Sequence, residues 1–98
     1  MSISINVMKQ GTHLLVAACD LNLLGKTLKF GKAKFNISKH FYGGSCVSVD
    51  EAVQMIRDGT NVNIVGPIIV RKAIEEGLIH PKAVIKISGI PHAQIMKV

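Results

Sequence analysis

SVDEAVQMIRDGTNVNIVGPIIVRKAIEEG, residues 48–77, is the stretch that decides the fold class of this chain. It begins with a capping-box pattern: Ser48 fits the N-cap of a helix, and Glu51 stands three residues later. An apolar stripe at helical spacing follows, made of Ala52, Val53, Met55 and Ile56. Asp58-Gly59 ends this pattern, so we expect a helix from Ser48 to Asp58.

The same stretch predicts a second helix after residues 61–65, which form a strand or, alternatively, a helical turn. Gly66-Pro67 begins this helix, because a proline at the first helical position gives up no hydrogen bond. Ile68, Ile69, Ala73 and Ile74 would face inward, and Gly77 is the expected C-terminal cap. Two amphipathic helices of this kind need a sheet to pack against.

Strand periodicity dominates the rest of the chain. Ile3, Ile5 and Val7 alternate with polar positions over residues 3–9, residues 10–12 form a turn, and residues 13–19 supply the other strand of a hairpin. Further short strands are expected at residues 27–29, 34–38, 84–88 and 92–96, with a loop or helical turn over residues 20–26. Phe35 and Ile37 would face the core. We therefore predict one α+β domain over residues 1–98, a mainly antiparallel sheet with two helices packed on one face.

Composition limits the functional classes. The chain has 98 residues, 48% of them hydrophobic, which favours one folded domain over disorder. Its net charge of +6 favours an anionic partner. Residues 1–7 carry no basic or long apolar segment typical of a signal peptide, and no apolar run reaches the ~18 residues of a membrane span. We expect a cytoplasmic protein with no membrane partner.

A lysine-rich stretch is the main functional signal. Between positions 26 and 39 the sequence has five lysines and no acidic residue, and it then continues as His40-Phe41-Tyr42-Gly43-Gly44. Lysines attract phosphate, an aromatic ring can stack on a base, and glycines allow close approach of a sugar-phosphate or simply a turn. The residues expected to contact nucleic acid are Lys26, Lys29, Lys32, Lys34, Lys39, His40, Tyr42, Gly43, Gly44 and His92.

Catalytic and cofactor motifs are weak by comparison. Leu24-Gly25-Lys26-Thr27 resembles the end of a phosphate-binding loop, but Asp20 stands where that motif needs its first glycine. The histidines and cysteines lack the short spacing of structural zinc ligands, although His40, Cys46 and His92 could still converge in space. We expect no cofactor, no metal and no catalytic residue.

Five segments, in order and over nearly the whole chain, resemble one family. They are Ala17-Ala18-Cys19-Asp20, Leu23-Leu24-Gly25-Lys26, Phe41-Tyr42-Gly43-Gly44, Val65-Gly66 and Gly89-Ile90-Pro91-His92-Ala93-Gln94. The sequence is similar to the small archaeal family called domain of unknown function four-two-four. Many members carry an acidic or polar residue where this chain has Pro67. The resemblance implies an archaeal cytosolic protein associated with translation, without established catalytic residues.

The matching positions would form the functional surface: Cys19, Asp20, Gly25, Lys26, Phe41, Tyr42, Gly43, Gly44, Pro91, His92 and Gln94.

Our first hypothesis is a non-enzymatic RNA-binding protein associated with archaeal translation, acting on the small ribosomal subunit or with a translation factor. Its partners would be ribosomal RNA and ribosomal proteins or translation factors. A second hypothesis is a small enzyme with Cys46 or Cys19 as nucleophile and His92 or His40 as base. A third is a protein-interaction subunit that docks through its tail, residues 90–98.

Overall fold

A six-stranded sheet forms the centre of the protein in the computed structural model, which describes residues 2–97. Its strand order is β5 (Ser45–Val47), β1 (Ile3–Gln10), β2 (His13–Asp20), β6 (Asn61–Val65), β8 (Ile90–Met96) and β7 (Ile85–Ile87). Every neighbouring pair is antiparallel except the central pair β2 and β6, which is parallel. The predicted α+β class with a mainly antiparallel sheet is confirmed.

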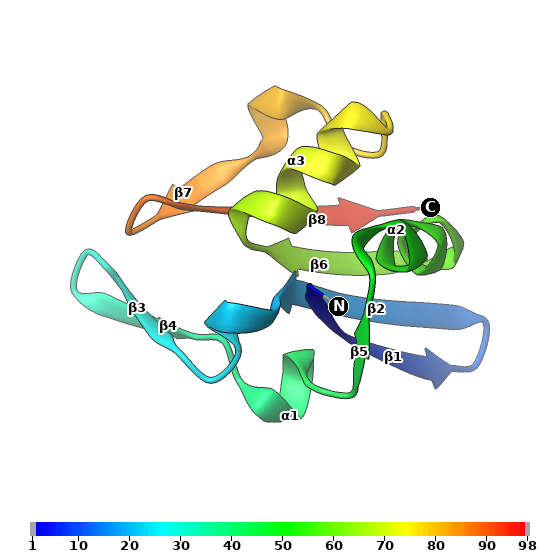
Figure 1. Ribbon diagram of the computed structural model, residues 1–98, viewed down its shortest axis with the longest axis horizontal. Coiled ribbons are helices and arrows are strands. Elements are labelled where there is room, and N and C mark those ends of the chain that lie inside the picture. The colour runs from blue at the N-terminus through cyan, green and yellow to red at the C-terminus, as the bar shows by residue number, and fades with distance from the viewer. Residues whose placement is uncertain (1, 98) are drawn as a thin grey trace.

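Two helices, α2 (Val49–Asp58) and α3 (Pro67–Glu75), pack on one face of this sheet (Figure 1). The predicted capping box is present, with the Ser48 hydroxyl accepting a hydrogen bond from the Glu51 N–H at 3.1 Å. Beneath the helices lies a fully apolar cluster that includes Ile3, Ile5, Val16, Ala18, Val62, Ile64, Ile69, Val70 and Ala73. We refer to this side of the sheet as the helix face.

Asp20, at the end of β2, fixes the start of α3 on the helix face. Its two carboxylate oxygens accept hydrogen bonds from the N–H groups of Ile68 and Ile69, at 2.9 and 3.0 Å. These N–H groups lack partners inside a helix, so the buried carboxylate acts as an N-terminal cap supplied from another element. Gly66 makes the approach possible, because it has φ of +126° and a Cβ there would overlap the carboxylate.

The opposite face of the sheet is only partly covered. The short helix η1 (Leu21–Leu23), the helix α1 (Lys39–Tyr42) and the hairpin formed by β3 (Thr27–Phe30) and β4 (Ala33–Asn36) lie on this side (Figure 1). They enclose a second cluster made of Ala17, Cys19, Leu23, Ile37, Tyr42 and Val65. We refer to this side as the hairpin face.

Several local expectations are corrected or refined by the structure. The expected strand 34–38 ends at Asn36, because Ser38 caps α1 by accepting a hydrogen bond from the Phe41 N–H. That four-residue helix and the short strand β5 were not predicted. The alternative of a helical turn at residues 61–65 is wrong, and a short helix η2 (Pro81–Ala83) precedes β7.

The tail expected to dock on a partner, residues 90–98, is not free. Residues 90–96 form β8 between β6 and β7 inside the sheet, and Val98 lies outside the described residues. Across residues 2–97, none of the helices is long and apolar enough to cross a membrane.

Candidate nucleic-acid interface

The five lysines expected to bind phosphate gather on and around one protruding hairpin. We call residues 26–39 the cationic segment. The register pairs Lys29 directly with Lys34 across the β3–β4 hairpin, and Lys32 lies in the turn that joins the two strands. Lys26 and Lys39 flank the base, where the Lys39 side chain lies against Gly25. Lys29 and Lys34 therefore share one side of the hairpin, and the other three lysines lie at its turn and its base.

Within residues 2–97, none of the five lysines forms an ion pair with a carboxylate. Among residues 2–97, the ion pairs are Arg57 with Glu76 at 2.8 Å, and Lys72 with Asp50 and Glu76 at 3.6 and 3.9 Å. All of them lie on the helix side, where the exposed acidic residues Asp50, Glu51, Asp58, Glu75 and Glu76 are also found. Positive charge thus dominates the hairpin, while the exposed acidic residues lie on α2 or at the C-terminal end of α3.

The direct pairing of Lys29 with Lys34 is unfavourable for the hairpin itself. Like charges at directly opposed positions of an antiparallel pair repel each other. On the same side of the hairpin, the Asn36 side chain donates a hydrogen bond to the Thr27 hydroxyl at 3.0 Å. A polyanion bound across the two lysines would relieve the repulsion.

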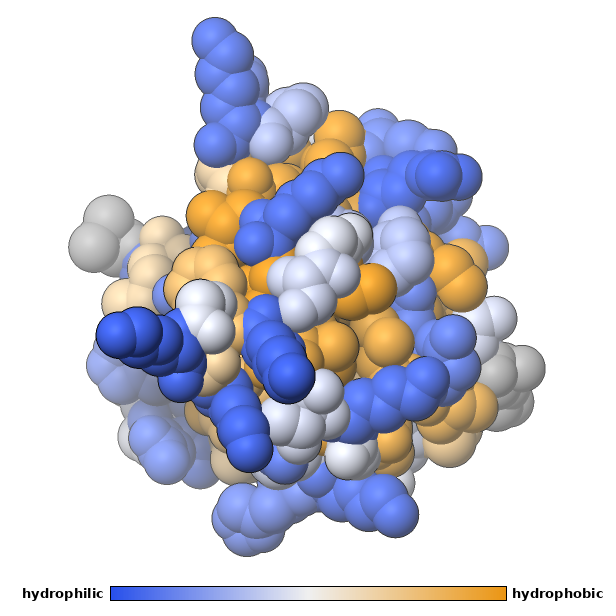
Figure 2. Space-filling model, turned by 90° about the vertical axis from the view of Figure 1, so that its left-hand side faces the viewer, coloured by the Kyte–Doolittle hydropathy of each residue, from blue (hydrophilic) through white to orange (hydrophobic). Residues whose placement is uncertain are grey.

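The other side of the hairpin anchors it to the sheet. Leu28 and Phe35, which pair across β3 and β4, pack against the second cluster. The Ser88 hydroxyl, in the turn between β7 and β8, donates a hydrogen bond to the carbonyl of Lys29. Figure 2 looks at this end of the molecule and shows hydrophilic side chains projecting around a hydrophobic area. The lysines therefore stand on a support that fixes their relative positions.

Phe30 is an exposed aromatic residue that the sequence interpretation missed. It ends β3, pairs with the small residue Ala33, and is 51% exposed. The alternation Leu28-Lys29-Phe30 before Gly31, mirrored by Ala33-Lys34-Phe35 after it, was the signal for a two-sided hairpin with this ring at its tip.

Tyr42, expected to stack on a base, does not offer its ring for stacking. It is 2% exposed, and its hydroxyl donates a hydrogen bond to Asn63 Oδ1. His92 Nε2 lies 3.0 Å from the same oxygen, and the His92 ring meets Phe35 edge-on, with centroids 5.3 Å apart. Burial raises the pKa of Tyr42, with a smaller contribution from Cys19, and burial lowers the pKa of His92. The two residues form an uncharged hydrogen-bonded cluster beneath the hairpin.

The structure explains the need for glycine at positions 43 and 44 in a different way from the two that we expected. Gly43 has ordinary extended angles, φ −85° and ψ 152°, so the interpretation as a turn needing unusual angles is wrong. A Cβ at Gly43 would overlap the Lys39 carbonyl, and one at Gly44 would overlap the Ile5 carbonyl of β1. The close approach is thus to the protein's own backbone. His40 is exposed on α1, next to the cationic segment.

The arrangement expected for a cysteine nucleophile is not present at Cys19. Its thiol is buried, and burial, followed by the charge of Asp20, raises the pKa of Cys19 to about 12. A thiol of this kind stays protonated and unreactive near neutral pH. His92 Nε2 is engaged with Asn63, and Cys46 is exposed on the edge strand β5.

Within the described part of the chain, no three His, Cys, Asp or Glu side chains converge as metal ligands would.

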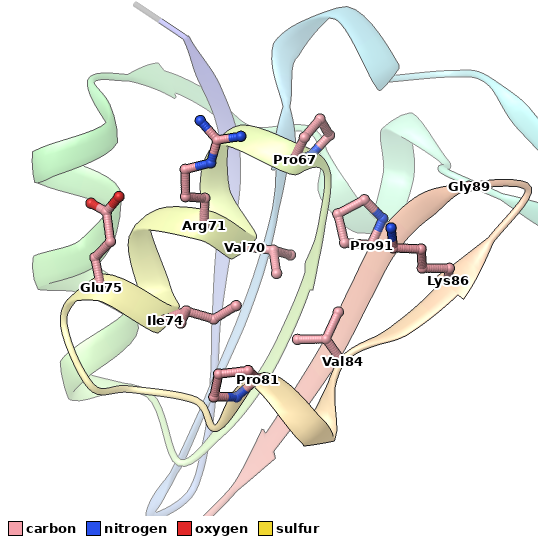
Figure 3. A pocket seen from close by; sticks show the side chains of 10 residues that line it. All are labelled: Pro67, Val70, Arg71, Ile74, Glu75, Pro81, Val84, Lys86, Gly89 and Pro91. Atoms are coloured by element: carbon pink, nitrogen blue, oxygen red, sulfur yellow. The ribbon is translucent and has the colours of Figure 1, made fainter.

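A groove of about 470 Å³ lies away from the cationic segment, between α3 and the β7 side of the sheet (Figure 3). Val70 and Ile74 of α3 face Val84 and Pro91 across it, and Arg71, Glu75 and Lys86 lie at its margins. Its walls are mainly apolar, so it differs in chemistry from the lysine-bearing hairpin.

These features define a small α+β protein with a lysine-bearing hairpin on one face of its sheet. The chain belongs to the family described as Protein of unknown function (DUF424), whose model matches residues 8–98. It is also similar to a solved structure, an uncharacterized conserved protein from Methanopyrus kandleri, with 27% identity and a TM-score of 0.83. That match covers 97% of this chain and 90% of the other. No protein with a curated description matches the chain.

The comparisons confirm the resemblance and agree with its archaeal character. Most positions that carry the resemblance make structural contacts here rather than forming an open surface. Asp20 caps α3, the Pro91 carbonyl accepts a hydrogen bond from the Gly66 N–H at 2.9 Å, and Tyr42 closes the second cluster. The sequence placed Asp20 on the expected functional surface and at the missing glycine of the phosphate-binding motif, because no local pattern reveals a cap for a helix that begins 47 residues later.

Proposed function

We propose that this protein binds RNA through the cationic segment, without catalytic activity of its own. The observation that supports this most is the set of five lysines on and beside a single anchored hairpin, without an ion-pair partner in residues 2–97. Each lysine that contacts a phosphate releases a condensed counterion, so affinity depends on local lysine density and on salt. His40 extends the interface along α1.

The proposed interface differs from the expected one. Lys26, Lys29, Lys32, Lys34, Lys39 and His40 remain in it. Tyr42 and His92 instead contact Phe35 beneath the hairpin, and Gly43 and Gly44 pack closely against the backbone of Lys39 and of β1. Support of this kind matters for binding, because phosphate contacts position a protein on RNA only if the side chains stand on a fixed frame.

We place this binding in the cytoplasm and in translation, on the small ribosomal subunit or with a translation factor. This setting is the one that the sequence resemblance implies, and a protruding hairpin whose lysines have no ion-pair partner in residues 2–97 is suited to an RNA surface rich in phosphate (Figure 1). Ribosomal proteins or translation factors would be neighbours in such a complex.

A charge-matched pair of variants tests the proposal. The Lys32→Glu/Lys34→Glu double variant should lose most RNA binding, measured by fluorescence anisotropy between about 50 and about 200 mM salt. The Lys9→Glu/Lys82→Glu double variant changes net charge equally, on β1 and η2, and should keep most of the affinity. Equal loss in both variants would show that only net charge acts, and absence of wild-type binding would reject RNA binding.

The translation setting needs its own measurement. Wild-type protein should co-sediment with small ribosomal subunits at low salt, and the Lys32→Glu/Lys34→Glu variant should stay in the supernatant. Binding to free RNA combined with no sedimentation at any salt concentration would remove the ribosomal part of the proposal while leaving RNA binding intact.

A further inference from the structure

We infer that the RNA bound by the cationic segment is single-stranded, with an unpaired base stacked on Phe30. This inference rests on the proposed function and adds the class of RNA and the residue that selects it. It starts from the one aromatic ring among the described residues that is more exposed than buried, since Phe35 and Phe41 are half-buried and Tyr42 is buried.

The exposure of Phe30 follows from its place on the hairpin. Leu28, Phe30, Ala33 and Phe35 share the side of the hairpin that faces the sheet. Leu28 and Phe35 lie over the second cluster and pack there, whereas Phe30 lies one step nearer the tip and remains 51% exposed. Its cross-strand partner Ala33 is too small to cover the ring. The ring thus has free area of the kind that a planar base can cover.

Three lysines lie close in sequence to this ring on the same short hairpin. Lys32 is in the turn two residues away, while Lys29 and Lys34 extend from the opposite side. Phe30 is the last residue of β3 and directly precedes the turn, so the phosphate of a nucleotide stacked on its ring can reach the Lys32 side chain. The flexible four-carbon stem of a lysine can adjust to that phosphate. A ring for the base and ammonium groups for the backbone are therefore present within one nucleotide's reach.

This geometry selects against duplex RNA. In an A-form helix the bases are stacked on one another, and the duplex offers phosphates and 2′-hydroxyls but no free base face. A single protruding ring can gain contact only with a base in a loop, a bulge or a strand end. The lysines alone would bind both forms, so the preference for single strands depends on Phe30.

Because the chain has no tryptophan, the fluorescence of one introduced tryptophan can report directly on stacking. The Phe30→Trp variant carries one tryptophan at the ring position, and its fluorescence should be strongly quenched by a single-stranded oligonucleotide, with little change on adding a duplex of the same sequence. The matched control is Met96→Trp, on a residue that is 70% exposed near the end of β8. Its fluorescence should not respond to either RNA.

Affinity measurements complete the test. The Phe30→Ala variant should bind the single strand about tenfold more weakly than wild type, as loss of one base–aromatic stack predicts. Phe30→Tyr should retain the affinity, and duplex binding should be the same in all three proteins. Circular dichroism must show that the variants fold.

The outcomes separate the two proposals. If no RNA binds, the proposed function fails. If RNA binds but the tryptophan of the Phe30→Trp variant is not quenched, or duplex binds as tightly as single strand, the role of Phe30 is rejected while the lysine interface stands.

Discussion

The two faces of the sheet use neighbouring residues of the same strands in opposite ways. In β6, Ile64 points to the helix face and is fully buried among aliphatic side chains, while Asn63 points to the hairpin face and bonds Tyr42 and His92. The helix face is closed by two complete helices. The hairpin face is partly covered by the two short helices η1 and α1, a hydrogen-bonded polar cluster and a hairpin that carries lysines outward.

The difference shows where most of the stability resides, and it separates that region from the surface where we propose that RNA binds. Burial of aliphatic side chains under α2 and α3 supplies most of the hydrophobic stabilisation. The hairpin face buries less, keeps polar groups in specific pairs, and exposes like-charged neighbours that weaken the fold locally. An unfavourable charge arrangement on a well-supported element is typical of a surface selected for a ligand rather than for stability.

The largest expected effect is on the helix face. Asp20→Ala removes both carboxylate acceptors and leaves the N–H groups of Ile68 and Ile69 without partners, which should cost about 3 kcal/mol of unfolding free energy. Thermal unfolding should then shift down by roughly 15 °C. The control Asp58→Ala, at an exposed position, should change stability by less than about 0.5 kcal/mol. Similar melting temperatures for the two variants would show that the Asp20 contacts do not hold α3.

An intermediate effect is expected in the polar cluster of the hairpin face. Tyr42→Phe keeps the ring but removes the hydrogen bond to Asn63, so the unfolding free energy should fall by about 1 kcal/mol in denaturant titrations. In the Asn63→Ala background the same substitution should cost much less, because the acceptor is already gone. Equal costs in both backgrounds would mean that the hydroxyl contributes without this partner.

The smallest expected effect is a gain in stability that accompanies a loss of binding. Lys34→Glu puts a negative charge directly opposite Lys29. This should stabilise the protein by about 0.5 kcal/mol and raise the melting temperature by roughly 3 °C. The same change should weaken RNA binding. Lys34→Gln, which only removes the repulsion, should give a smaller gain. A lower melting temperature for Lys34→Glu would contradict the proposed strain between the two lysines.

The sequence was sufficient to predict those helices and strands whose signals lie within a few neighbouring residues. The capping box at Ser48, the Gly66-Pro67 start of α3 and the alternation in β1 each depend on residues within a few positions, and all three were predicted. The helix α1 was missed, because four residues give no periodicity and Ser38 continued the alternation of the preceding strand. The parallel contact of β2 with β6 has no local signal.

The candidate site was predicted in its charges but not in its aromatic residues. Lysines can be expected on the surface whatever fold the chain adopts, because burying an unpaired ammonium group is costly. Whether a ring is buried depends on distant partners: Tyr42 is enclosed by residues of β2 and β6, whereas Phe30 extends past the second cluster. The adjacent letters Phe41-Tyr42 could not reveal this difference.

The parallel pairing of β2 with β6 also has a consequence for how the chain folds. The middle of the sheet can form only when residues 13–20 pair with residues 61–65. Contacts between segments so distant in sequence form slowly. The β3–β4 hairpin needs only a short loop and can close within microseconds. Hairpin pairing can therefore begin during synthesis, but it becomes stable only once the sheet that supports it has formed.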